Sequence, residues 1–349
     1  MLGRGCRAFH CRPIRFLQRP DLWDDDPVDR VWGMKLILPA LMLAVAPVEA
    51  VLFHATDDIT HNREVAPGGS LAGSGWQFQG EFGNFTGTMI APQFFITAKH
   101  LGVPSSTFVS TGYFNGGSDV VYTVDTTANG GTGYWNIGST DLRVFKINET
   151  FSSYAPLYTG SGEVGEELVV MGRGTQRGTA VTEMEMSGAT IGWKWGTSDH
   201  ATRWGTNEVH STVSSGGANY LYSTFDLGVG GDEAHLSTGD SGGAVFIQDG
   251  GVWKLAGINY AVDGLWDYND VVDTNEFNAA LFDSRGLYVG SDGDGWTLVE
   301  DEGSPEPSGF YATRISSYHG DIAAITGVPE PGILACLVVG LGMIGRRRR

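Results

Sequence analysis

One segment of the sequence carries a residue that could act as a nucleophile. Ser241 stands in Ser237–Phe246, where a Gly-Asp-Ser-Gly-Gly run precedes an apolar strand. A serine hydroxyl is a weak nucleophile and needs a neighbouring base. The oxyanion that forms on attack needs two backbone amides aimed at one point. Glycine at position 239 lets the loop curl so that the amides of Gly239 and Ser241 converge, so the pattern predicts a nucleophile with an oxyanion hole.

Two other segments offer a base and a group to orient it. His100 ends a strand–turn–strand segment that begins at Gly87, and none of the other seven histidines has this setting. Asp141 stands directly before an alternating strand that runs to Ile147. An aspartate that accepts the Nδ1–H of a histidine fixes the tautomer in which Nε2 can take a proton. We therefore predict that His100, Asp141 and Ser241 form a catalytic triad.

Short strands must position these residues. Strand-like runs alternate with Gly, Asn, Asp and Ser, and no long helical period appears between roughly residues 76 and 315, which indicates an all-β fold.

The composition excludes two other kinds of site. The net charge of −18 makes a nucleic-acid partner unfavourable, because an acidic surface repels phosphate groups. The three cysteines, Cys6, Cys11 and Cys336, lie in the tails. No disulfide or cysteine metal site is therefore expected in the folded part.

The three segments resemble the trypsin/chymotrypsin family of serine peptidases in order and spacing. Leu255–Ile258 resembles the strand beside the family's specificity pocket, and Gly309–Ile322 resembles its last strand and C-terminal helix. The resemblance implies a peptidase domain over residues 51–327, built from two six-stranded antiparallel β-barrels that divide near residues 155–165. It also implies a monomer that cleaves polypeptides through an acyl-enzyme and needs no cofactor.

The resemblance also assigns a substrate-binding set, which is His235, Thr238, Tyr260 and Gly309. His235 lies six residues before Ser241, where trypsin-type enzymes have aspartate. No buried anion is expected there for a lysine or arginine side chain, so cleavage of the tryptic type is not expected. Tyr260 falls where the family usually has a serine that supports the catalytic aspartate.

The activation end of the family is missing, because the chain has no Ile-Val-Gly-Gly start. In the family the new amine pairs with the aspartate that matches Asp240, and an unpaired buried Asp240 would be costly. Three alternatives stay open: a cut at Arg63-Glu64, the amine of Val51, or a preformed site without an activation step.

Residues 263–308 form an insertion rich in Asp, Gly and Asn. A connection of this length is usually functional or disordered, and it is expected to border the specificity pocket. Asp292–Gly295, with acidic residues at 300–302, could bind a structural calcium ion. The spacing does not fit an EF-hand, and a solvated acidic loop is the preferred interpretation, so no metal ligand is assigned.

The two tails carry targeting patterns. Residues 34–50 have a lysine, an apolar stretch and a small-x-Ala end, which predicts a signal peptide cut after Ala50. Residues 1–33 are then interpreted as an over-extended N-terminus that precedes the true start at Met34. The alternative is that they form a long n-region of the signal peptide. Residues 328–349 contain Pro329-Glu330-Pro331, an apolar stretch and four arginines, and they resemble a PEP-CTERM sorting signal, with an ordinary tail anchor as the alternative.

That resemblance implies N-terminal signal and C-terminal anchor helices. It also implies export across the inner membrane of a Gram-negative bacterium, transient anchoring, handling by an exosortase-type sorting enzyme, and a place at the cell surface or in an exopolysaccharide matrix.

Three functions fit the sequence: a secreted serine endopeptidase, a catalytically weak or inactive protease-fold binding protein, and an esterase. The Gly-Asp-Ser-Gly-Gly run has the spacing of the Gly-x-Ser-x-Gly elbow of many esterases, but it ends in a different turn and precedes an apolar strand.

Overall fold

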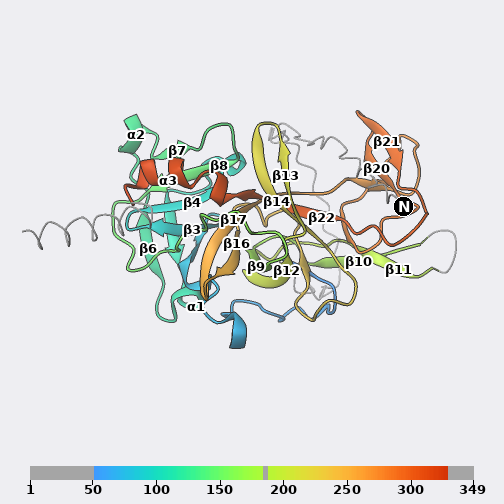
Figure 1. Cartoon of the computed structure of the whole chain (residues 1–349), viewed down its shortest axis with the longest axis horizontal. Helices are drawn as coiled ribbons and strands as arrows, with labels where there is room; N and C mark the ends of the chain where they lie inside the picture. The colour runs from blue at the N-terminus through green and yellow to red at the C-terminus, as the bar shows by residue number, and fades with distance from the viewer. Residues whose placement is uncertain (1–50, 184–187, 329–349) are drawn as a thin grey trace, which may run out of the picture. The chain divides into compact units, whose positions relative to one another are not determined.

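A computed structural model describes residues 51–183 and 188–328. The predicted signal peptide at 34–50 and nearly all of the predicted sorting segment lie outside these residues. Within them, no helix is both long and apolar enough to cross a bilayer. Two antiparallel seven-stranded sheets dominate the described chain (Figure 1). The all-β, chymotrypsin-like prediction is therefore confirmed.

The first sheet closes into a barrel around a phenylalanine-rich core. A bridge between Val124 and Ile147, just past the ends of β6 and β8, joins the two sides of the sheet. Gly80 is required here, because a Cβ at this position would lie 2.3 Å from the ring of Phe108. The strands in sheet order are β6 (Val120–Thr123), β5 (Thr107–Ser110), β2 (Gln79–Phe82), β3 (Phe85–Ala91), β4 (Phe94–Ala98), β8 (Leu142–Lys146) and β7 (Tyr134–Asn136).

The second sheet closes through a bent segment of chain. Its two outermost strands, β12 and β13, follow one another in the sequence with only Val209 and His210 between them. Each barrel therefore has the six strands that were predicted. The first barrel has β7 in addition, and in the second barrel β12 and β13 together make one strand that is interrupted by a bend. The order is β12 (Arg203–Glu208), β9 (Glu167–Gly172), β16 (Ala244–Asp249), β17 (Val252–Val262), β22 (Gly309–Arg314), β14 (Ala218–Thr224) and β13 (Ser211–Ser215).

Short helices flank the sheets, and the predicted C-terminal helix is present as α3 (His319–Thr326). Its Ile322 packs into a buried cluster that contains Ile96 of the first barrel and Phe246 of the second. The barrels therefore share a core. The other helices are α1 (Gly112–Asn115), α2 (Ala128–Gly131) and the 3₁₀ turns η1 (Gly69–Leu71), η2 (Trp76–Phe78), η3 (Lys99–Leu101) and η4 (Ile315–Ser317).

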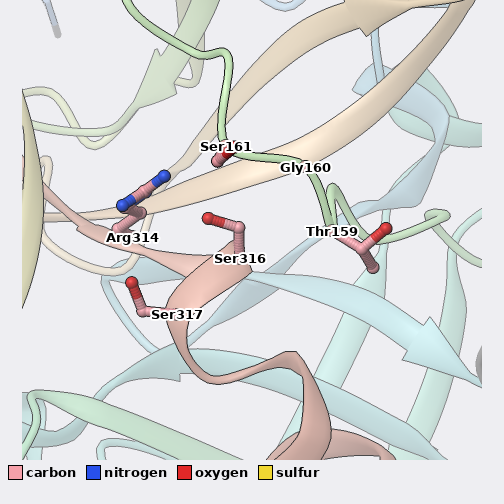
Figure 2. Close-up of a pocket in the computed structure, with 6 residues that line it drawn as sticks. All are labelled: Thr159, Gly160, Ser161, Arg314, Ser316 and Ser317. Carbon is pink, nitrogen blue, oxygen red and sulfur yellow. The ribbon is translucent and has the colours of Figure 1, made fainter.

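The connection between the barrels is held by a buried ion pair. Glu163 is fully buried and accepts two hydrogen bonds of 2.7 Å from the guanidinium of Arg314 and one of 2.6 Å from Ser316. Figure 2 shows the neighbouring open pocket of about 360 Å³, which Arg314 lines with Thr159, Gly160, Ser161, Ser316 and Ser317. Because Glu163 already neutralises Arg314, this pocket is not a candidate anion site.

Three smaller sheets complete the fold. β1 (Leu52–Phe53) pairs with β15 (Ala234–His235), so the beginning of the described chain lies against the second barrel. The insertion is folded: its β19 (Ala279–Leu281) joins β10 (Arg177–Thr182) and β11 (Thr190–Trp195) in one sheet. The rest of the insertion forms a second sheet from β18 (Trp266–Asp267), β20 (Tyr288–Ser291) and β21 (Gly295–Leu298).

Candidate active site

Strand register places His100 beside Asp141. β4 and β8 pair so that Ala98 stands opposite Leu142. His100 lies in η3, directly after β4, and Asp141 directly precedes β8. The two residues therefore meet at one end of the paired strands, where the backbone amide of Lys99 donates to the carbonyl of Asp141 at 2.8 Å.

Both carboxylate oxygens of Asp141 bind His100, one at the imidazole and one at the backbone amide. Nδ1 donates to Oδ2 at 2.6 Å, and the backbone amide of His100 donates to Oδ1 at 2.8 Å. The aspartate side chain is 9 % exposed, whereas the histidine side chain is 30 % exposed. Since an ionised carboxylate only accepts, the proton sits on Nδ1, and Nε2 is left to act as a base.

Ser241 reaches this pair through its neighbours in the chain. A Cβ on Gly242 would lie 2.2 Å from Thr97 Oγ1 and 2.9 Å from Leu101 Cδ1, so only glycine lets the loop touch the segment around His100. No hydrogen bond joins Ser241 to the ring of His100 within the described parts of the chain. His100 and Asp141 are thus in contact, and the loop of Ser241 contacts the segment around His100 through Gly242. Hydrogen bonds between a nucleophile and its base are often long before substrate binds.

The loop that carries Ser241 has two backbone amides that are available to bind a substrate oxygen. Of the five backbone amides from 239 to 243, those of Asp240, Gly242 and Gly243 donate to carbonyl oxygens of the protein. The amides of Gly239 and Ser241 have no acceptor among the described residues. Gly239 has φ +94°, a conformation that favours glycine. The loop geometry therefore leaves free the two donors that were predicted to hold an oxyanion.

Asp240 finds its partners within the chain. It is 1 % exposed, and its carboxylate accepts from the amide of Gly174 at 2.7 Å, the amide of Ser237 at 2.7 Å and the hydroxyl of Ser237 at 3.0 Å. Burial raises the pKa of Asp240 to about 7, and these hydrogen bonds act in the opposite direction. This arrangement agrees with the alternative of a preformed site, because no chain-end amine is needed to satisfy the carboxylate.

The other two proposed activation ends are occupied elsewhere. The amide of Glu64 donates to the carbonyl of Thr202 at 2.9 Å, and the guanidinium of Arg63 lies 3.0 Å from a carboxylate oxygen of Asp199. Val51 is buried and leads into β1, which pairs with the strand directly before Ser237. The N-terminal segment therefore braces the nucleophile loop through β15.

The predicted substrate-binding residues differ in exposure. His235 is fully buried, its Nδ1 lies 2.7 Å from the carbonyl of Leu236, and burial lowers its pKa to about 4, so it is neutral at pH 7. Gly309 is buried in β22, whereas Thr238 is exposed. Tyr260 is half-buried, with its ring centroid 6.1 Å from that of His100.

Asp263, which the sequence analysis did not single out, contacts Gly309 of the predicted substrate-binding set. Its carboxylate accepts from the hydroxyls of Tyr222 at 2.6 Å and Tyr311 at 2.7 Å and from the amide of Gly309 at 2.8 Å. Burial raises the pKa of Asp263, and the hydrogen bonds act in the opposite direction. Its place directly after β17 was the available signal. Three donors engage this carboxylate, so it does not restore a free anion to the pocket.

The acidic residues of the insertion gather at a different place from the predicted one. Asp292 accepts from the indole nitrogen of Trp296 at 3.1 Å. Within the described chain, the three carboxylates close enough to share a metal ion belong instead to Asp267, Asp273 and Glu276.

Comparisons with known proteins find one matching family and several similar structures. A family model described as Trypsin matches residues 64–272, which is more than half of the chain. Among solved structures 649 chains match, and one is human heparin binding protein, with 13 % identity and a TM-score of 0.42 over 76 % of this chain and 99 % of that one. No curated protein matches the sequence.

Proposed function

Because the chain belongs to the trypsin family, we propose that it is a serine endopeptidase in which Ser241 attacks the peptide carbonyl. The observation that carries this proposal is the 2.6 Å bond between His100 Nδ1 and Asp141 Oδ2. That bond leaves Nε2 free to act as the base for Ser241, whose loop contacts the segment around His100 through Gly242. The rest of the site supplies the groups that acyl transfer needs.

In the proposed reaction His100 Nε2 takes the proton of Ser241 as Oγ bonds to the substrate carbonyl carbon. The carbonyl oxygen becomes an oxyanion, and the free amides of Gly239 and Ser241 stabilise it. His100 then returns the proton to the leaving amine as the peptide bond breaks. Water repeats the sequence on the acyl-enzyme and frees Ser241. Asp141 stabilises the imidazolium throughout without taking a proton.

The pocket residues favour an uncharged side chain at the cleaved bond. His235 is neutral at pH 7, and the carboxylate of Asp263 is engaged by three donors. A lysine or arginine side chain would lose its hydration there without gaining an unoccupied carboxylate. We therefore expect slow cleavage after lysine and arginine.

A second candidate function is a binding protein that keeps this fold without catalysis, since fold alone does not secure activity. The altered pocket position His235, which is buried and neutral at pH 7, favours it. In either case we propose export, with a signal peptide at 34–50 and a sorting segment at 328–349 that anchors the protein before release at the cell surface.

A peptide library tests the proposed activity. The purified protein should hydrolyse peptides, and Ser241→Ala should lower kcat by on the order of 10⁵ to 10⁶-fold, because the nucleophile is lost. Ser161→Ala, which changes an exposed serine of the pocket in Figure 2, is the matched control and should retain full activity. Absence of hydrolysis by the folded protein, or equal rates in the Ser241 variant, would favour the binding protein.

A further inference from the structure

The insertion contains a loop that is closed at its base. Trp266 and Phe277 exchange two backbone hydrogen bonds, of 2.9 and 2.8 Å, so the ten residues between them form a loop. Asp267 and Glu276 are the residues just inside this base, and they therefore stand next to each other. Asp273 folds back toward them. One carboxylate oxygen from each of the three lies within 4.8 Å of the other two.

Two of these carboxylates have an oxygen without a partner. Asp267 is 1 % exposed, and its Oδ1 accepts from the amides of Tyr268 at 2.6 Å and Asn269 at 3.3 Å. Its Oδ2 is buried and has no hydrogen-bond partner in the described chain. Glu276 Oε2 is likewise buried and unpartnered. A buried carboxylate oxygen with nothing to bind is costly.

The charges of this cluster are not balanced by a nearby cation. Lys194 is the basic residue beside the loop, and its Nζ lies over the ring of Phe277, 4.0 Å from the centroid, and 5.7 Å from the ring of Tyr268. No ion pair between Lys194 and the three carboxylates occurs in the described residues. Three carboxylates brought together in a partly buried loop repel one another unless a cation joins them.

We propose that Asp267, Asp273 and Glu276 bind a calcium ion. All three ligands offer oxygen, which hard divalent cations prefer. Calcium takes oxygen ligands at about 2.3–2.6 Å, so opposite ligands of one ion lie up to about 5 Å apart, and a spread of 4.8 Å fits within this shell. Magnesium demands shorter bonds and stricter octahedral geometry, which an irregular loop meets less readily. The ion satisfies the buried oxygens of Asp267 and Glu276.

The site is connected to His235, a residue of the predicted substrate-binding set. The chain continues from Phe277 into β19, where Leu281 exchanges backbone and side-chain hydrogen bonds with Ser308 at 2.8 and 2.9 Å. The hydroxyl of Ser308 lies 3.4 Å from Nε2 of His235. Calcium bound in the loop stabilises this side of the second barrel, because it binds the folded loop and not the unfolded chain.

Calorimetric titration of the purified protein with calcium chloride, together with thermal melting in calcium and in EDTA, tests the proposal. The wild-type protein should bind calcium and melt at a higher temperature in calcium than in EDTA. Asp267→Asn should weaken calcium affinity by at least about tenfold and remove most of the calcium-dependent shift. Asp292→Asn removes the same charge elsewhere in the insertion and should leave both measurements unchanged.

Melting in EDTA separates a lost ligand from a damaged fold. Without calcium, Asp267→Asn should melt at or above the wild-type temperature, because it removes one uncompensated buried charge. If this variant does not fold, Asp273→Asn, at a more exposed position, takes its place with the same expectation. Absence of calcium binding by the wild-type protein, or equal affinity in the ligand variant, overturns the proposal.

Discussion

The nucleophile loop and the insertion each contain an aspartate that is 1 % exposed, Asp240 and Asp267, yet they solve the problem of burial differently. Asp240 accepts three hydrogen bonds from Gly174 and Ser237. Asp267 accepts two amides on Oδ1 and keeps Oδ2 unpartnered in the described chain, beside two further carboxylates. The chain itself supplies the hydrogen-bond donors for the buried carboxylate of Asp240, whereas the carboxylate of Asp267 requires a partner from outside the chain, which we propose is a calcium ion.

The largest effect should come from removing Asp240. Asp240→Ala leaves the buried amides of Ser237 and Gly174 without an acceptor, which should cost about 2–6 kcal/mol in the free energy of unfolding, whereas the hydroxyl of Ser237 keeps the carbonyl of Thr175 at 3.2 Å. Peptide hydrolysis should fall with it, because the same contacts shape the turn that carries Gly239. Denaturant melts and kcat of the variant measure both effects.

Asp249→Ala is the control for this prediction. Asp249 is an exposed acid of the same barrel that pairs with Lys254, and its loss should cost no more than about 1 kcal/mol. A similar cost for the two variants would mean that the contacts of Asp240 do not hold the loop.

Glu233 is an intermediate case between the two aspartates. It is 4 % exposed and accepts from the side-chain amide of Asn207 at 3.0 Å and from the amide of Asp226 at 3.2 Å. Burial raises its pKa from 4.5 to about 8. Between these values the folded protein holds a proton that the unfolded chain releases. This group therefore lowers the free energy of unfolding as pH rises from about 4.5 to 8.

Glu233→Gln keeps an oxygen acceptor and removes this titration. Relative to the variant, the wild-type protein should lose roughly 2–4 kcal/mol of stability between pH 5 and 8. His235, whose pKa is lowered to about 4, contributes the opposite slope from pH 4 to 6.5, but it is common to both proteins and cancels. Urea melts across this range measure the difference, and Glu302→Gln, at an exposed position of the insertion, should not change it. Parallel curves for Glu233→Gln and wild type would contradict the prediction.

Features that depend on short sequence motifs could be predicted from the sequence, whereas features that depend on contacts between distant residues could not. His100 and Asp141 could be paired in advance because each stands at the end of a strand in a recognisable segment. The donors of Asp240 could not, because Gly174 lies 66 residues away and is identified only by the packing of the second barrel. The segment 292–295 suggested a calcium site because acidic residues are close together in the sequence there. The oxygens gather instead where the Trp266–Phe277 pairing folds Asp267 and Glu276 together, and no spacing rule in the sequence gives that pairing.

The role of Ser241 is tested most directly by labelling the uncut protein with a fluorophosphonate probe and locating the modified residue by mass spectrometry. A nucleophile activated by His100, in a loop already braced by Asp240, should carry the label on Ser241 without prior proteolysis. The label should be absent from Ser241→Ala. A folded protein that takes up no label, or one that is modified equally in Ser241→Ala, would contradict the assignment.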